Sequence, residues 1–113
     1  MAIIYRKLFQ PAVLGTSAGT LFTVDSAPST TLLRGGRVRF TNTSTSAVQV
    51  SAWAVPAAGA SGDDNSIVKN RSIAPGDYLD IDLPTMAAND FLQASARAAT
   101  SITAHFISGA YYS

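Results

Sequence analysis

Two carboxylates placed two residues apart are the sharpest chemical feature of this sequence. Asp80 and Asp82 stand in the alternating stretch DYLDIDL, so both side chains lie on one face of a strand, about 6.5–7 Å apart along the backbone. A pair at that separation could hydrolyse a glycoside or bind a hard cation. Because Leu79, Ile81 and Leu83 point to the opposite face, we instead expect the carboxylates in solvent or beside arginines of a neighbouring strand or subunit.

The other residues capable of chemistry lack the partners that they need. His105 is the single histidine, and no G-x-S-x-G stretch supplies the serine of a triad. SGDDNS lacks the alternating spacing and the closing Glu of a calcium loop, and LRGGR lacks the spacing and the Lys of a phosphate-binding loop. There is no Cys for a disulfide or a thiolate site. We therefore expect no catalytic residue, no metal site and no cofactor.

Charged residues are scarce. They make up 13% of the 113 residues, and the net charge is +1, whereas an average protein has about 25% charged residues. So weakly charged a surface is expected to contact other proteins or further copies of the chain. Arg34, Arg37 and Arg39 are the clustered basic residues, and Arg37 and Arg39 form a row on one strand face that would complement Asp80 and Asp82 of another subunit. This row is too small to predict nucleic-acid binding, and no apolar run is long enough to predict a membrane span.

Alternation with a period of two predicts strands almost throughout. Val38 and Phe40 share one face of GRVRFTN; the polar turn NTSTSA and the strand VQVSAWAV follow, which together predict an antiparallel hairpin. For NSIVKN the pattern leaves a strand and a helical turn open. About eight strands predict an all-β fold, an antiparallel β-sandwich or jelly roll. We expect residues 13–113 to form one sandwich domain and residues 1–12 an N-terminal arm or edge strand.

Both ends of the chain carry more apolar and aromatic side chains than a solvated tail needs. AIIYRKLF contributes Ile3, Ile4 and Tyr5, and the closing AYYS contributes Tyr111 and Tyr112. We expect these ends to form strands or to contact a neighbouring molecule.

Trp53, the single tryptophan, can face either way. It alternates with Val50 and Ala52, so it lies in the core if they do not. If it points outward, it stands beside Gln49 and Ser51, where it could contact a protein or a sugar ring.

Four stretches of the sequence carry a family resemblance. They are GTLFTV (19–24), GGRVRFTNTSTSAVQVSAWAVP (35–56), NSIVKNRSIAPGDYLDIDL (65–83) and DFLQASARAATSITAHFISGAYY (90–112). Over about residues 13–110 the chain resembles small β-sandwich virion structural proteins of tailed bacteriophages. The most distinctive block is IVKNRSIAPG, in which Asn70 suits left-handed backbone and Pro75-Gly76 a tight turn.

The resemblance implies a non-enzymatic virion protein. The first expectation is a capsid decoration, or cement, protein that binds the major capsid protein or other virion proteins and reinforces the head. It would be a homo-oligomer on the capsid surface, made in the host cytoplasm. The alternative is a tail-associated host-recognition module that binds cell-surface carbohydrate through Trp53, Tyr111 or Tyr112. The residues expected at protein interfaces are Ile3, Ile4, Tyr5, Arg37, Arg39, Trp53, Asp80, Asp82, Tyr111 and Tyr112.

Overall fold

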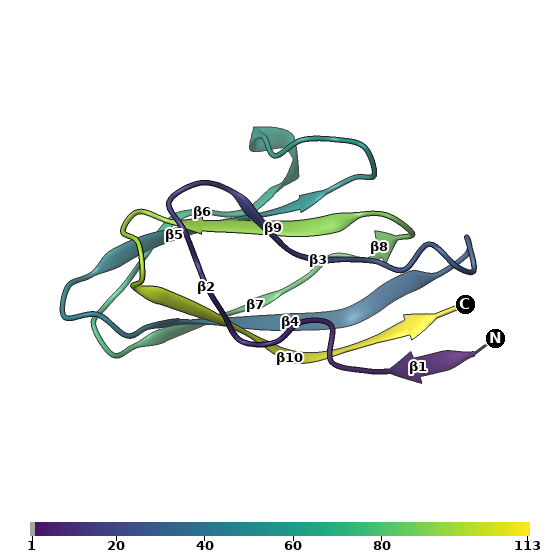
Figure 1. Ribbon diagram of the computed structural model, residues 1–113, viewed down its shortest axis with the longest axis horizontal. Helices are drawn as coiled ribbons and strands as arrows, with labels where there is room; N and C mark the ends of the chain where they lie inside the picture. Colours follow the sequence, from purple (N-terminus) through teal and green to yellow (C-terminus); the bar gives the residue numbers. More distant parts are fainter. Residues whose placement is uncertain (1) are drawn as a thin grey trace.

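Alternating apolar and polar residues fold this chain into two antiparallel sheets packed face to face (Figure 1). The computed structural model describes residues 2–113. Sheet A has the order β1 (Ile3–Tyr5), β10 (Ile102–Tyr112), β4 (Leu32–Asn42) and β7 (Tyr78–Asp82), with β2 (Ala12–Val13) paired to β10 and β8 (Met86–Ala87) paired to β4. Sheet B has the order β3 (Gly19–Thr23), β9 (Phe91–Ala96), β5 (Val48–Val55) and β6 (Ser66–Ile73). The expected all-β sandwich is confirmed.

Two details go beyond the sequence-based expectation. Within residues 2–113 the sandwich has ten strands, two of which, β2 and β8, contain only two residues. The stretch NSIVKN is strand from Ser66 onward, and the short 3₁₀ turn η1 (Asp63–Asn65) comes just before it. Asn70 and Gly76 both have positive φ angles, of 51° and 73°, as their residue types predicted.

The core lies between the sheets, and its members follow the expected alternation. Val38 and Phe40 of β4 are fully buried, as are Val50 and Ala52 of β5. In β7 the inward residue Ile81 is buried, while the neighbouring carboxylates point away from the core. The pattern of single residues therefore predicted correctly which face of each of these strands is buried.

The predicted hairpin between the strands around 36–42 and 48–55 is wrong. β4 pairs with β7, β8 and β10, whereas β5 pairs with β6 and β9, so residues 43–47 carry the chain from sheet A to sheet B. A short polar turn serves either connection, and the alternation of the two strands is the same in both. The choice of partner depends on strands far away in the sequence, which the local pattern does not contain.

A buried amide holds this crossing in place. The side-chain Nδ2 of Asn42 donates to the carbonyl oxygens of Ser46 and Ile73, both at 2.8 Å, and its Oδ1 accepts from the backbone N–H of Ser44 at 2.9 Å. Its own backbone N–H donates to Asp77, and its carbonyl accepts from Gly76, each at 2.9 Å. The side chain is inaccessible to solvent, so these bonds replace the hydration that the amide loses on folding.

We predict that Asn42→Ala lowers the free energy of unfolding by about 2–4 kcal/mol, because it removes three side-chain hydrogen bonds to backbone groups at once. Urea denaturation followed by circular dichroism measures the change. Thr45→Ala, an exposed position in the same turn with no side-chain hydrogen bond, is the matched control and should change stability by less than about 0.5 kcal/mol. Equal effects of the two substitutions would contradict this role for Asn42.

Glycine bulges reverse which side chains face the core near the ends of β4 and β10. The pairing register shifts between Phe106 and Ala110, where Gly109 has a φ of 149°, and Gly35 opposite has a φ of 67°. Beyond the bulges Tyr111 lies in the core, with 2% of its surface exposed, and its burial raises the pKa of the phenol. The expectation that Tyr111 contacts a partner or a sugar is therefore wrong.

The N-terminal segment contributes to both an edge and the core. β1 is the edge strand of sheet A and pairs with the end of β10. Further along, the Phe9 ring stacks on Phe22, with 5.9 Å between ring centroids, and meets Phe106 edge-on at 6.1 Å. Residues 3–5 thus form an edge strand, while Phe9 anchors the following segment over the gap between the sheets.

Candidate interaction surfaces

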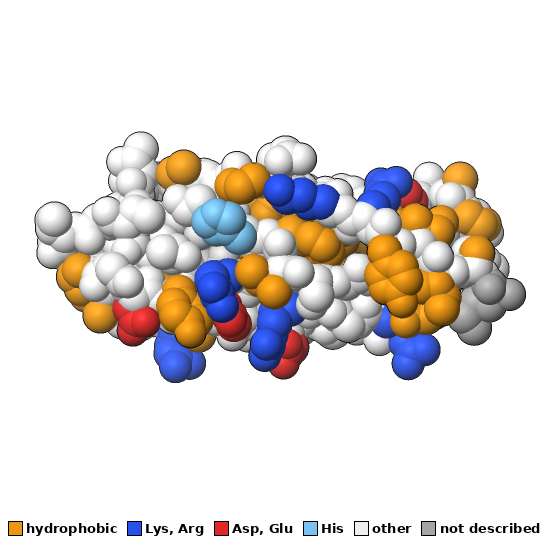
Figure 2. All heavy atoms as spheres, turned by 90° about the horizontal axis from the view of Figure 1, so that it is seen from below, with side chains coloured by type: hydrophobic (Ala, Val, Ile, Leu, Met, Phe, Trp, Pro, Cys, Tyr) orange, Lys and Arg blue, Asp and Glu red, His pale blue; other side chains and the backbone are white. Residues whose placement is uncertain are grey.

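Cross-strand ion pairs cover the middle of the outer face of sheet A. The Arg39 guanidinium binds both carboxylate oxygens of Asp80, at 2.7 and 3.0 Å, and Arg37 donates to Asp82 at 3.0 Å. The register explains both pairs, because β4 and β7 place Arg39 opposite Asp80 and Arg37 opposite Asp82. Figure 2 shows blue and red side chains side by side near the pale-blue histidine, His105, which lies opposite Arg39 on β10.

These pairs are satisfied within one chain. The Arg39 guanidinium also lies over the Tyr78 ring, 4.2 Å from its centroid. The hydrogen bonds from Arg39 lower the pKa of the Asp80 carboxyl. The arginine row and the two aspartates are therefore partners on neighbouring strands, one of the two arrangements left open by the sequence, and the pairing between subunits loses its basis.

Asp80 and Asp82 are not part of a metal-binding cluster among the described residues. Within residues 2–113 there is no group of three or more His, Asp or Glu side chains arranged to hold a metal ion. The same residues contain no helix long and apolar enough to cross a membrane.

β1 presents an open, apolar strand edge. Ile3, Ile4 and Tyr5 are 49%, 45% and 77% exposed. The Ser113 N–H donates to the Ala2 carbonyl at 3.1 Å, which fixes the alternation of hydrogen-bonded pairs along β1 and β10. In the observed register Ile4 exchanges bonds with Tyr111, so the N–H and C=O groups of Ile3 and Tyr5 point away from the sheet.

The other sheet edges are protected in ways that β1 is not. The outer strand β7 carries Asp80 and Asp82, and β6 carries Lys69 and Arg71 around a register shift. β3 begins with Gly19 and contains a bulge. Charges and bulges discourage a further strand from pairing, whereas a regular apolar edge invites one. Among residues 2–113, β1 is thus the edge best suited to accept a strand.

A hollow of about 660 Å³ adjoins β1 on the outer face of sheet A. The bulges of β4 and β10 form its floor, and Tyr5 and Tyr112 stand at its border. Lys7 and Arg34 give it a positive rim, and the Arg34 guanidinium lies 5.4 Å from the centroid of the Tyr112 ring. In Figure 2 hydrophobic side chains gather at the same end of the molecule, where the termini lie.

Trp53 lies on the outer face of sheet B, which resolves the alternative left by the sequence. Val50 and Ala52 are buried on the inner face, while Trp53 is half-buried on the other. It borders a second hollow, of about 330 Å³, with Gln49 and Ser51 beside it. The expected neighbours of an outward Trp53 are therefore present.

Sequence reasoning brought some of these residues together and missed others. It found the apolar β1 residues, the arginine row and the outward environment of Trp53. It noted Arg34 only as part of a basic cluster and did not single out Lys7 or Arg97. All three line the hollows, and a sequence does not show which basic residues will border a concave surface. The signal available for the hollow beside β1 was the pair of interior glycines, Gly35 and Gly109, since glycine within a strand pattern indicates a bulge.

No protein family, curated protein or solved structure matched this chain in the comparisons.

We predict that Asp80→Asn destabilises the fold at neutral pH and that its effect shrinks in acid. The pKa of Asp80 is lowered in the folded state, so its contribution is complete above the unfolded pKa of about 3.9 and is lost as pH falls through the lower, folded value. Denaturant unfolding of both proteins at pH 7 and pH 2.5 measures the difference. Asp82→Asn is the control, with a single hydrogen bond and a carboxylate that is 78% exposed; its effect at pH 7 should be smaller. An unchanged Asp80→Asn difference at pH 2.5 would contradict the pairing.

Proposed function

We propose that this chain is a non-enzymatic structural protein of a bacteriophage virion, a capsid decoration protein that attaches to the shell through its β1 edge. The proposal combines the resemblance of residues 13–110 with the surface just described. The observation that carries it is the open edge: Ile3 and Tyr5 turn unpaired backbone groups and exposed side chains to the outside. A strand of a shell protein can add to sheet A there, with backbone bonds giving affinity and side chains giving specificity.

The surroundings of β1 define the chemistry of the partner strand. The adjoining hollow can take an apolar side chain beside Tyr5 and Tyr112. Lys7 and Arg34 on its rim form no salt bridge within residues 2–113, so an acidic residue on the partner would complement them. The partner is thus an extended segment with apolar and acidic residues. Each such contact buries little area, and attachment to a shell gains strength from many copies acting together.

The attachment can be tested by removing an outward N–H group without disturbing β10. We predict that Ile3→Pro leaves the fold intact and lowers the affinity for shells lacking the protein by at least about tenfold, because the proline ring replaces the donor and blocks the partner strand. Quantifying the chain that sediments with such shells over a range of concentrations gives the affinity. A visible density at β1 in an electron cryomicroscopy map of the saturated shell would locate the contact.

Val13→Pro is the matched control. Val13 is 59% exposed on the same edge of sheet A, and its N–H also points away from β10, since Leu14 is the residue that bonds Ile102. This variant should bind shells like the parent. Unchanged binding by Ile3→Pro would contradict the role of the edge. So would a parent dimer that Ile3→Pro converts to an 11.8 kDa monomer while shell binding persists, because the edge would then join copies of the chain.

A further inference from the structure

The hollow around Trp53, here called the Trp53 trough, has the composition of a ligand site. It lies on the outer face of sheet B between β6 with η1 on one side and the segment before β3 on the other. Its volume of about 330 Å³ is at the lower end of the range for small-molecule sites. Its lining residues are Thr16, Gln49, Ser51, Trp53, Asp63, Lys69, Asn70, Ser95, Ala96 and Arg97. One aromatic ring is therefore surrounded almost entirely by polar side chains.

The aromatic ring is held on rigid structure. Trp53 stands in the middle of sheet B, with Gln93 opposite it on β9 and Ser66 opposite it on β6. It is half-buried, so part of its surface is fixed by packing and part borders the trough. An aromatic surface presented in this way can stack against the C–H groups of a sugar ring at little entropic cost.

One part of the polar lining is fixed by internal bonds. The Asn70 N–H donates to the Ser51 hydroxyl oxygen at 2.9 Å, and that hydroxyl donates to the Asn70 side-chain oxygen at 3.3 Å. Together these bonds hold Asn70 at a φ of 51°. The Lys69 ammonium lies 2.7 Å from the Asp63 carboxylate, and this bond lowers the pKa of Asp63.

The other polar side chains of the lining are available to a ligand. Within residues 2–113 the side chains of Thr16, Gln49, Ser95 and Arg97 donate and accept no hydrogen bond in the structure. Hydroxyl, amide and guanidinium groups of this kind can bind the hydroxyl groups of a ligand directly. A ligand rich in hydroxyl groups satisfies such a lining better than an apolar one does.

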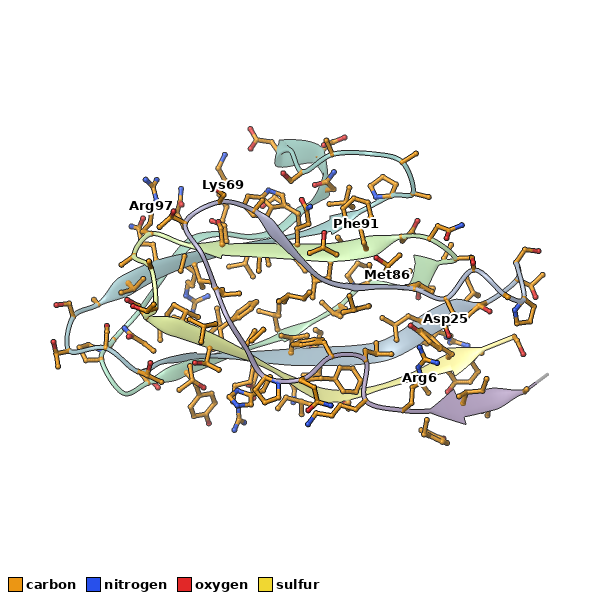
Figure 3. All side chains as sticks on the ribbon, in the orientation of Figure 1. Arg6, Asp25, Lys69, Met86, Phe91 and Arg97 are labelled. Atoms are coloured by element: carbon orange, nitrogen blue, oxygen red, sulfur yellow. The ribbon has the colours of Figure 1, made fainter. Side chains whose placement is uncertain are left out.

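Charge narrows the class of ligand. Lys69 and Asp63 neutralise one another, which leaves Arg97 as the one charged side chain of the described trough without an ion-pair partner. Figure 3 shows Lys69 and Arg97 projecting on the same side of sheet B, away from sheet A. A guanidinium with all its donors available binds a carboxylate through two parallel hydrogen bonds.

We infer that the Trp53 trough binds a carboxylated sugar, a uronic or sialic acid unit of a polysaccharide, with its ring on Trp53 and its carboxylate on Arg97. This inference does not depend on how the chain attaches to a shell. The trough and the β1 hollow lie on the outer faces of opposite sheets. A chain attached by β1 therefore leaves the trough open to the surrounding medium.

The single tryptophan makes the trough directly observable. Trp53 is the source of all tryptophan fluorescence in this chain, so a sugar stacked on it changes the emission. Titration of the purified full chain with glucuronic acid, sialic acid and neutral glucose should give a saturable change with the two acids and at least tenfold weaker binding of glucose. A glycan array then distinguishes single acidic sugars from polysaccharides that contain them.

Two substitutions separate the roles of charge and ring. Arg97→Gln should weaken binding of the acidic sugars at least tenfold and leave binding of glucose unchanged, whereas Arg71→Gln, an exposed arginine of β6 outside the trough lining, should change neither. Trp53→Ala should abolish binding on the array and leave the thermal midpoint of unfolding unchanged. If Trp53→Ala lowers that midpoint, Trp53→Leu should show the same loss of binding. Equal affinity for glucose and the acids, retained binding by Arg97→Gln, or binding of single-stranded oligonucleotides in place of sugars would overturn the inference.

Discussion

The arrangement of both outer faces depends on one buried amide. Asn42 ends β4, and its bonds reach Ser46 in the crossing to β5, Ile73 at the end of β6 and the turn that leads into β7. Two connections between the sheets are thereby fixed at one point. Since β5 carries Trp53 and β7 carries the aspartates of the ion pairs, the relative positions of the two surfaces follow from it. A fully satisfied polar group in an apolar core selects one arrangement over its alternatives, because every other one leaves the amide unpaired.

The two sheets divide the surface into parts with different physical properties. In sheet A the ion pairs between β4 and β7 occupy the middle of the face and one edge, so an added strand there would meet charge. The opposite edge, β1, has neither charge nor bulge. Sheet B instead places a single ring among polar and charged side chains. One core thus supports an edge suited to backbone pairing and, facing the other way, a trough suited to a polar ligand.

The sequence correctly predicted which face of a strand is buried, because that depends on neighbours along the same strand. It did not predict which strands pair, because that depends on strands distant in the sequence. Alternation gave the buried faces around Phe40, Val50 and Ile81 correctly. Asn42 falls in the predicted polar turn NTSTSA, although alternation carried on through residue 42 puts it on the face of Val38 and Phe40, where it is buried. The hairpin was wrong because a crossing between sheets leaves no local mark. The exposure of Tyr111 was wrong because the bulges at Gly35 and Gly109 shift the alternation, and counting residues across a glycine does not reveal that shift.

Most of the basic residues that form no salt bridge within residues 2–113 line one of the two hollows described above. The chain has eight basic and seven acidic residues, and four salt bridges within residues 2–113 use four of each. The basic residues left over are Lys7, Arg34, Arg71 and Arg97. Three of these four line a hollow: Lys7 and Arg34 the one beside β1, and Arg97 the Trp53 trough. A paired cation has little attraction left for an external anion, whereas an unpaired one at a concave surface remains available to bind an anion. The basic side chains without a salt bridge within residues 2–113 therefore lie mostly where a partner or ligand can approach.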